Sequence, residues 1–511
     1  MILKIGYSFF LGSLLIIAFE PFNVWALAFI VPFLLKLNIE NKSPLATGLI
    51  GYFFGLGFWL FGVFWIENSI NVYGGADVFT SSALTVLLTL FLSLFQGVSF
   101  FLFGLLKRNN LFSDFLLFPS IWVLSEWLRE FIFSGFPWLY LGYSSLNNFL
   151  VNGYVPILGV FGASFIIVTL SMSLKVLFFN YQRPLSKPFI FSISLILFFY
   201  VSNTFLKDIN WTEPKEVVDV VLVQPNIGIK EKWTSEGEQE SSNLLNTTLF
   251  NESSRLINDS KVPKLFFFPE AFLPGKFSDF QILLKPILSL TERANIGVTL
   301  GAISENEENY ELFNSLISFG IIEGKYNKEK LVPFGEYVPS KFFDKFFNFF
   351  NFNRPQINSG EDNKIFESKD FSFYGSICYE VAYQDLYLKY AAKSNFLFTA
   401  SNDAWFGQTI GPHQHLQIAR FRALESRKPL IRSTTSGISA IVNTKGETLK
   451  FIELDNDANE KNNPKFISHR LTIFEGTTPF IRYGKMPLLF LISFILIIFS
   501  CLLYTSPSPR D

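Results

Sequence analysis

Long apolar runs separated by short polar stretches occupy roughly the first two hundred residues, and one more apolar run lies near the C-terminus. The apolar core of a bilayer requires about 20 apolar residues in a helix, so each run can be tested by its length. The pattern predicts about eight transmembrane helices, at residues 5–19, 23–36, 44–66, 80–106, 111–128, 154–178, 188–206 and 486–504. Because only EPFN joins the first two runs, a tight hairpin is expected there.

The basic residues of the short loops predict the orientation of these helices, since positive charge is retained on the cytoplasmic side. In an eight-span arrangement the opposite short loops carry only Arg129, whereas one side carries Lys4, Lys36, Lys42, Lys107, Arg108, Lys175, Arg183 and Lys187. Both termini are therefore expected in the cytoplasm. The polar part of the chain is expected outside the bacterial inner membrane, in the periplasm.

The beginning of the chain resembles a signal peptide, since MILK precedes an apolar stretch. No small-residue cleavage site precedes Glu20-Pro21, and a second apolar run follows at once, so an uncleaved span is expected. Glu20, Glu67, Glu126 and Arg129 lie in or beside predicted spans, where charge is costly unless it is paired or hydrated. Functional and structural pairings are equally open for these four residues.

Three segments follow from this pattern. Residues 1–206 form a transmembrane domain of about seven helices, residues 207–480 an extracytoplasmic domain, and residues 481–511 a last helix with a short tail. The middle segment contains short apolar runs that end in polar residues and read as strands: VVDVVLVQPN, KLFFFPEA, NIGVTLGA, NSLISFGII, FSFYGSICYE, NFLFTASND and SAIVNTKG. Helical patterns such as HQHLQIARFRALESR lie between some of them, which predicts an α/β sheet covered by helices.

Composition and charge narrow the class of partner. The chain is 49% apolar and 18% aromatic, with a net charge of −1. No basic stripe marks the polar segment, so nucleic acid is not an expected partner, and lipids or proteins are. The Ser/Asn/Glu-rich stretch 234–259 is expected to be a long surface excursion with some helix, and the terminal TSPSPRD is assigned no role.

The chain has few residues that could act as nucleophile or metal ligand. Its three histidines are His413, His415 and His469, and no third His or Cys stands near the first two, so neither a histidine base nor a metal pair is expected. Of the two cysteines, Cys501 falls in the last predicted span, which leaves Cys378 as an unpaired thiol in an oxidising compartment. Such a thiol requires an explanation, although a small buried apolar residue at a strand end remains the alternative.

A nucleophilic Cys378 needs a base that takes its proton and a cation that favours the thiolate. Glu270 in LFFFPEA follows a strongly apolar strand, where its carboxylate could lie at the sheet end. Lys328 in YNKEKLVPFGEYVP precedes a loop punctuated by Pro and Gly, with Glu336 eight residues further on.

Glu270 in PEAFLP, Lys328 in YNKEKLVPFGEYVP and Cys378 in GSICYE resemble the Glu-Lys-Cys triad of the nitrilase superfamily, in its order along the chain. The flanking motifs LVPFGEYVP, SICYE, SNDAWFG and HQHLQIARFRALE resemble those of the apolipoprotein N-acyltransferases, which carry this domain between membrane spans. AFEPFNVW, GFWLFGVFWIENSINVYGG, LSEWLRE, GFPWLYLGYS and TTPFIRYG extend the resemblance over nearly the whole chain. One departure is Thr435 in RSTTSG, where many members have Asn.

The resemblance implies an αββα sandwich and an acyl transfer from a membrane phospholipid to the N-terminal amine of a diacylglyceryl-cysteine lipoprotein, through a thioester. It implies Glu270 as base, Cys378 as nucleophile, and Lys328 with the backbone N–H of Tyr379 as oxyanion donors. Glu336, Trp233, Tyr379 and Glu380 match further functional positions, although Glu380 could equally belong to a structural hydrogen-bonded network. No cofactor or metal is implied, and a monomer is expected.

The stretch KFFDKFFNFFNFNRP, from Lys341 to Pro355, is rich in phenylalanine and is expected to form a lid that dips into the bilayer. The alternative is a helix that packs its aromatic face on the domain. Three other functions remain open: a membrane-anchored nitrilase-type amidase that uses water, a transporter, and a binding protein with an inactive nitrilase fold. The absence of an inverted repeat opposes a transporter, and the intact triad opposes the inactive fold.

Overall fold

The structure, a computed structural model, describes residues 1–108, 110–256, 262–293, 295–338, 357–361, 364–454 and 463–504. The chain divides into two compact units, one made of Met1–Asn210 with Arg482–Asp511 and the other of Trp211–Ile481. The phenylalanine-rich stretch expected to form a lid and the terminal TSPSPRD lie outside the described residues.

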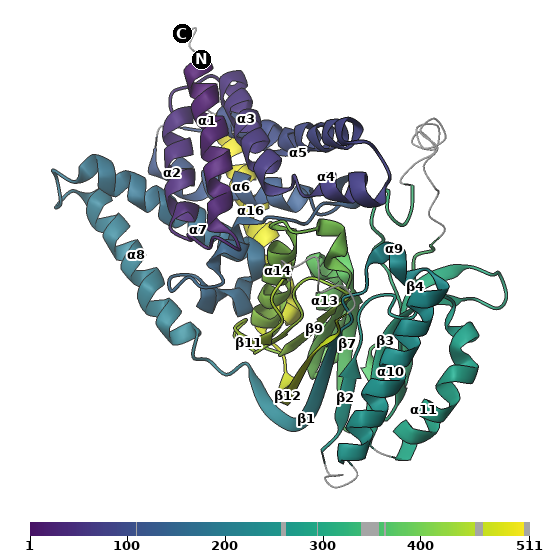
Figure 1. Cartoon of the computed structure of the whole chain (residues 1–511). Coiled ribbons are helices and arrows are strands. Elements are labelled where there is room, and N and C mark those ends of the chain that lie inside the picture. Colours follow the sequence, from purple (N-terminus) through teal and green to yellow (C-terminus); the bar gives the residue numbers. More distant parts are fainter. Residues whose placement is uncertain are drawn as a thin grey trace. The chain divides into compact units, whose positions relative to one another are not determined.

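The first unit is helical, and helices occur in each stretch where an apolar run predicts one (Figure 1). Their bounds are α1 Ile2–Leu15, α2 Leu27–Ile39, α3 Pro44–Gly62, α5 Val78–Leu106, α6 Phe118–Leu128, α7 Val155–Asn180, α8 Lys187–Leu206 and α16 Met486–Tyr504. Among the described residues, α3, α5, α8 and α7 with its preceding turn are long and apolar enough to cross a membrane. Because α1, α2 and α16 are apolar but shorter, the structure supports a membrane protein without fixing eight spans.

Four of the lysines used to predict orientation lie within helices: Lys4, Lys36, Lys175 and Lys187. Lys36 of α2 and Lys175 of α7 are buried, and each lies within 2.8 Å of an oxygen of Asp114, whose carboxylate they share. Lys175 also lies 2.6 Å from Glu40 Oε1. Buried cations in a membrane helix bundle need such partners, so the charges of Lys36 and Lys175 are paired within the bundle.

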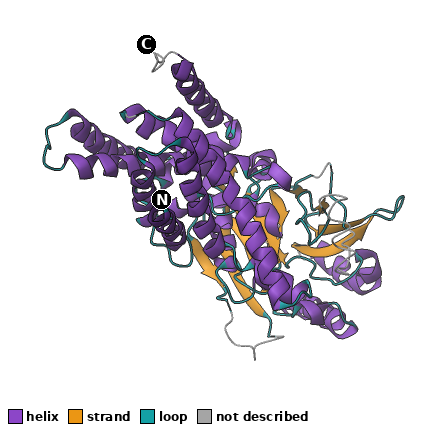
Figure 2. Cartoon of the chain, turned by 90° about the horizontal axis from the view of Figure 1, so that it is seen from above, coloured by secondary structure: helices purple, strands orange, loops and turns teal. Residues whose placement is uncertain are grey.

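The second unit contains every named strand of the described residues (Figure 2). One six-stranded sheet has the order β12-β1-β2-β3-β4-β5 and the other β11-β10-β9-β8-β7-β6. The strands of the first are β1 Thr212–Gln224, β2 Lys264–Phe267, β3 Ile296–Glu305, β4 Leu312–Gly320, β5 Gly324–Asn327 and β12 Lys465–Gly476. Those of the second are β6 Phe366–Glu367, β7 Ser372–Ile377, β8 Phe396–Ser401, β9 Leu430–Thr434, β10 Ala440–Val442 and β11 Thr448–Phe451.

Aromatic side chains fill the space between the two sheets. The ring of Phe267 on β2 lies 4.6 Å from that of Phe398 on β8 and 5.6 Å from that of Phe373 on β7. Strands buried on both faces read as nearly continuous apolar runs, which is why KLFFF and NFLFTA are so apolar.

Helices cover the outer faces of both sheets (Figure 1). On the first sheet, α10 Ser235–Leu256 and α11 Gln281–Arg293 contribute Leu245 and Leu284 to a buried apolar cluster with the strands. The stretch 234–259, expected as a surface excursion with some helix, is helical through Leu256 and is packed through the buried Leu245 and Leu249. On the second sheet lie α13 Gln384–Tyr390 and α14 Gly411–Ser426.

The strand directions bring the candidate residues to one edge of the sandwich. β1, β2 and β3 are parallel, and so are β7, β8 and β9. β5 runs in the same direction as β3, because both are antiparallel to β4. Sites of α/β folds form beyond the carboxyl ends of such strands, and Glu270, Lys328 and Cys378 follow β2, β5 and β7.

Candidate active site

Glu270 lies in a tight turn just beyond β2. The next residue, Ala271, has φ +44°, and the turn packs so closely on β3 that a Cβ at Gly301 would lie 2.4 Å from the Ala271 nitrogen. Only glycine fits there. The Glu270 carboxylate is buried, and its Oε1 accepts from Asn314 Nδ2 at 2.8 Å. Its Oε2 has no hydrogen-bond partner among the described residues and so keeps its lone pairs available for a proton.

Lys328 is fixed by its backbone on both sides. Its N–H donates to the carbonyl oxygen of Asn314 on β4, and its own carbonyl oxygen accepts from the Gly360 N–H, each at 2.8 Å. Its Nζ is fully buried and lies 2.9 Å from both oxygens of Glu336 and 3.4 Å from Glu270 Oε1. Burial alone would lower the pKa of Lys328, but the carboxylates of Glu336 and Glu270 outweigh it and hold the pKa above its usual value.

Glu336 is held by a turn of its own loop, in which its Oε2 accepts from the Val332 N–H at 2.8 Å. Its Oε1 accepts from Asn314 Nδ2 at 3.0 Å, so one amide group bridges Glu336 and Glu270. The cation therefore lies between two carboxylates whose spacing Asn314 maintains. Asn314 was not singled out in the sequence, because an Asn inside a strand has no distinguishing local signal.

Cys378 follows β7 directly and begins a short 3₁₀ turn, Cys378–Ala382. Its φ of +54° is unusual for a side-chain-bearing residue, and such strain is held only where the surroundings fix it. Burial first, and the Glu270 carboxylate second, raise the pKa of the Cys378 thiol to about 12, against the effects of Lys328 and Ser401. The resting group is therefore a thiol, which would need a base before it could act as a nucleophile.

Glu380 is a fully buried acceptor that joins the Cys378 turn to the Lys328 segment. Its Oε2 accepts from the Ile377 N–H at 2.7 Å, and its Oε1 from the backbone N–H groups of Glu329 and Lys330 and from the Tyr326 hydroxyl at 2.7–3.0 Å. Burial raises the pKa of Glu380 to about 7 despite these donors. The geometry favours the network alternative of the sequence analysis.

Two further predicted positions lie at the margin of this cluster. Tyr379 is half-buried, with its ring edge-on to that of Tyr383 at 5.2 Å. Trp233 follows the short helix α9 Ile229–Lys232, and its side chain is 53% exposed. It is the preceding Lys232 that reaches the cluster: its buried Nζ donates to the Glu270 carbonyl oxygen at 3.0 Å, and burial lowers the pKa of Lys232 to about 8.

His415, which stands in the motif HQHLQIARFRALE but is not predicted as a site residue, lies beside Cys378. Its Nε2 is 3.1 Å from the Cys378 carbonyl oxygen, and its Nδ1 is 3.0 Å from Asp403 Oδ1. Thr435, the departure from the family motif, is buried beyond β9, where its N–H donates to the Ser401 carbonyl oxygen at 3.0 Å.

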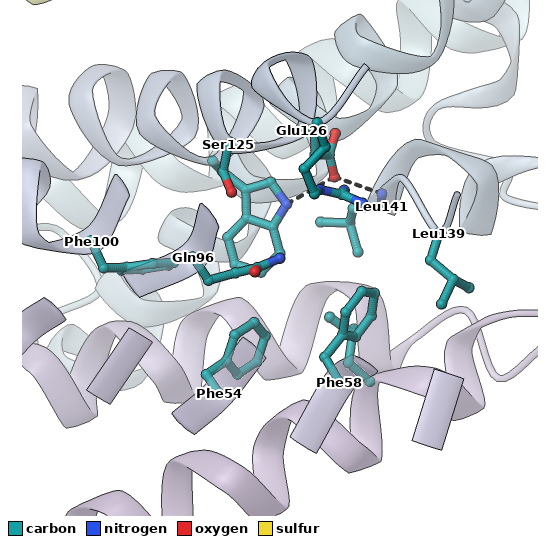
Figure 3. A pocket seen from close by; sticks show the side chains of 11 residues that line it. Phe54, Phe58, Gln96, Phe100, Ser125, Glu126, Leu139 and Leu141 are labelled. Atoms are coloured by element: carbon teal, nitrogen blue, oxygen red, sulfur yellow. Dashed lines mark hydrogen bonds between the residues drawn. The ribbon is translucent and has the colours of Figure 1, made fainter. Parts of the chain in front are cut away.

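The helical unit has a cavity of its own among α1, α3, α5 and α6 and the segment after α6 (Figure 3). Two of the predicted intramembrane charges line it. Glu126 Oε1 accepts from Trp122 Nε1 at 3.1 Å and from the Leu141 N–H at 2.7 Å. Arg129 Nη1 donates to the Trp138 carbonyl oxygen, and its guanidinium lies 4.5 Å from the ring of Trp59. These contacts give both charges structural partners.

Comparison with known proteins extends over both units. Residues 11–173 match the family model of the apolipoprotein N-acyltransferase N-terminal domain, and residues 250–460 match that of the carbon-nitrogen hydrolases. Among solved structures, Nit3 of Saccharomyces cerevisiae, a member of branch 10 of the nitrilase superfamily, aligns with a TM-score of 0.37 at 14% identity, covering 59% of this chain and 99% of that one.

Two curated relatives match nearly from end to end. The apolipoprotein N-acyltransferase of Coxiella burnetii is 33% identical, covering 96% of this chain and 98% of its own length. That of Wigglesworthia glossinidia brevipalpis is 34% identical, covering 97% and 98%. Together with the two family models, these matches confirm the resemblance predicted from the sequence motifs. The chain belongs to the apolipoprotein N-acyltransferase family, with a carbon-nitrogen hydrolase fold in its C-terminal half.

Proposed function

We propose that the protein transfers an acyl chain from a membrane phospholipid to the free α-amine of the N-terminal diacylglyceryl-cysteine of apolipoproteins, the last step of lipoprotein maturation. The arrangement of Glu270 and Lys328 supports this reaction most directly. Glu270 keeps one buried oxygen without a partner while its other oxygen is held by Asn314, beside the Lys328 cation that also acts on Cys378. A buried thiol, a poised carboxylate and a fixed cation are the groups that nucleophilic catalysis by cysteine requires.

In the first half-reaction, Glu270 takes the proton of Cys378 and the sulfur attacks the ester carbonyl carbon of the phospholipid. Lys328 and the backbone N–H of Tyr379 stabilise the oxyanion. As the C–O bond breaks, protonated Glu270 returns its proton to the leaving oxygen. A lysophospholipid departs, and a thioester remains on Cys378.

In the second half-reaction, the neutral α-amine attacks the thioester carbonyl. Glu270 takes the proton that the nitrogen loses, the C–S bond breaks, and the proton returns to the sulfur of Cys378. An amide forms at the expense of a thioester, which is downhill. This order predicts ping-pong kinetics and an acyl-enzyme that accumulates when no amine is present.

The remaining residues hold these groups in place. Glu336 and Asn314 fix Lys328 at hydrogen-bond distance, so the cation needs no reorganisation when the oxyanion forms. Glu380 fixes the turn at Cys378 against the Lys328 segment. Tyr379 supplies its N–H, and exposed Trp233 contacts lipid near the cluster.

The lipid substrates require a membrane setting. We place about eight helices across the bacterial inner membrane, both termini in the cytoplasm, and the catalytic domain in the periplasm. The segments are the predicted 1–206, 207–480 and 481–511, and the protein acts as a monomer. The enzyme needs no cofactor.

The second candidate is a membrane-anchored amidase that would use the same residues with water in place of the amine. The family membership of the N-terminal helices favours transfer. Incubation of the purified protein with labelled phosphatidylethanolamine and a diacylated lipopeptide decides between them. We expect label on the peptide amine, lost in Cys378→Ala; free fatty acid without acylated peptide would support the amidase.

A further inference from the structure

The carbonyl group of Cys378 is held by a buried chain of polar side chains from three elements. His415 comes from α14, Asp403 from the 3₁₀ turn Asp403–Phe406 after β8, and Arg432 from β9. All three are at most 1% exposed. His415 Nε2 lies 3.1 Å from the Cys378 carbonyl oxygen, and its Nδ1 lies 3.0 Å from both Asp403 Oδ1 and Arg432 Nη2.

These contacts determine which ring nitrogen of His415 carries hydrogen. A carbonyl oxygen can only accept, so Nε2 must donate to Cys378. Arg432 Nη2 also donates to Asp403 Oδ2 at 2.6 Å, and this cation and His415 hold the pKa of Asp403 at about 2 against burial. Burial and Arg432 lower the pKa of His415, whereas Asp403 raises it, and Nε2 carries hydrogen in either charge state of the ring.

The carbonyl group that His415 contacts belongs to the same peptide unit as the Tyr379 N–H. A peptide unit is planar, so a hydrogen bond to its oxygen fixes where its N–H points. It also polarises the unit, which makes that N–H a stronger donor. Within this turn Glu380 accepts from the N–H of Ile377, one residue before Cys378, whereas His415 acts on the Cys378–Tyr379 peptide unit itself.

We propose that His415 is a positioning residue for acyl transfer: its Nε2–H holds and polarises the Cys378–Tyr379 peptide unit so that the Tyr379 N–H is aimed at the oxyanion. This inference rests on the proposed function. His415 touches neither substrate nor thiol in this role and takes no proton. A buried histidine that served packing alone would have no reason to donate to the Cys378 carbonyl group while Asp403 and Arg432 hold its other ring nitrogen.

Two reactions of Cys378 separate this role from a structural one. Acylation by a labelled phospholipid passes through an oxyanion, whereas alkylation by iodoacetamide needs the thiolate but forms no oxyanion. Loss of a direct oxyanion donor costs about 10²–10³-fold in rate, and weakening one through its peptide unit should cost less, roughly 10- to 100-fold. In full-length His415→Leu we expect acylation to slow by that factor while alkylation stays within about twofold of wild type.

Polar variants keep the test decisive if His415→Leu does not fold. The amide of His415→Gln can reach the position of Nε2, whereas that of His415→Asn reaches only the position of Nδ1. We expect His415→Gln to acylate about tenfold faster than His415→Asn, at equal alkylation rates. His469→Leu, on the edge strand β12, is the matched control and should behave as wild type.

Two results would overturn the inference: acylation and alkylation slowed equally in His415→Leu, or His415→Gln and His415→Asn acylating alike. Cys378→Ala tests the proposed function separately. If acylation persisted without the thiol, the thioester mechanism would fail whatever His415 does. If it vanished while His415→Leu remained fully active, only the inference about His415 would fail.

Discussion

Replacement of Lys328 by methionine tests whether the cation is required for both folding and chemistry. Its Nζ is buried between Glu336 and Glu270, and their carboxylates raise its pKa above the usual value. A raised lysine pKa means that the stabilising contribution is complete below the unfolded value of about 10.4 and is lost only as the pH rises through the higher folded value. At neutral pH the whole contribution is therefore present.

The magnitude follows from the charges left behind. Lys328→Met removes the cation from a buried site that still holds two carboxylates, and breaking a buried ion pair by removing one partner costs about 3–5 kcal/mol. For a unit of this size each kcal/mol shifts the thermal midpoint by about 2–4 °C, so a fall of about 6–20 °C is expected. Adding Glu336→Gln removes one uncompensated charge and should recover at least about 1 kcal/mol of this loss. Acyl-enzyme formation should stay absent in both variants.

The assay is thermal unfolding of the detergent-solubilised protein followed by tryptophan fluorescence, with acyl-enzyme formation measured in parallel by intact mass. Lys325→Met is the control, because Lys325 is exposed on β5 three residues away and should change the midpoint by less than about 2 °C. An unchanged midpoint in Lys328→Met would refute the argument that the two carboxylates depend on this cation. Acylation of Cys378 in that variant would refute its role in the chemistry.

Three further results are expected. Glu380→Ala leaves the buried Ile377 N–H and the buried Tyr326 hydroxyl without this acceptor, at about 1–3 kcal/mol each, so its midpoint should fall by more than about 4 °C, whereas exposed Glu323→Ala should not differ from wild type; equal midpoints would contradict the network role. Because the pKa of Cys378 is raised to about 12, its alkylation by iodoacetamide should still be rising with pH at about pH 9.5, and a plateau below about pH 8.5 would contradict the buried thiol. Asp114→Asn takes the shared charge from two buried lysines and should destabilise the helical unit by about 3 kcal/mol; equal survival of wild type and variant on heating in detergent would contradict this.

The sequence predicts the strands of the catalytic unit well where both faces are buried. VVDVVLVQ, KLFFF and NFLFTAS are apolar throughout, and they become β1, β2 and β8. The four edge strands β5, β6, β11 and β12 are not among the predicted strands, because a strand that lies at the margin of a sheet needs few apolar residues. At 234–259 a surface excursion with some helix is predicted. The polar composition of this stretch hid the single apolar face through which α10 packs.

Some residues of the candidate site could likewise be predicted from the sequence, and others could not. Glu270, Lys328 and Cys378 stand in distinctive motifs, and the structure brings them together at one edge of the sandwich. Lys232, Asn314 and His415 have no such local signal. Their side chains contact Glu270 or Cys378, which lie far away in the sequence. These contacts depend on the tertiary fold rather than on neighbouring sequence. The flanking motif HQHLQIARFRALE contained the one available clue to His415.

The sequence alone also does not show which charged residues of the helical unit pair with one another. Lys36 and Lys175 fall near the ends of the predicted spans 23–36 and 154–178, and nothing beside them in the sequence shows what pairs their charges. Their partners Asp114 and Glu40 come from other segments of the chain, and only the packed helices bring them together. Asp114 and Glu40 neutralise much of the charge of Lys36 and Lys175. The proposed orientation of the helices therefore rests on the other basic residues.

The central claim is that Cys378 carries the acyl chain between two substrates, and intact mass spectrometry tests it most directly. The purified protein is incubated with a phospholipid of defined acyl chain in the absence of an amine, and a diacylated lipopeptide is then added. We predict that the protein gains the mass of one acyl group at Cys378, that hydroxylamine removes it, and that the lipopeptide discharges it as an N-acyl product. Transfer to the peptide at full rate by Cys378→Ala, or an adduct that the peptide cannot discharge, would contradict the account.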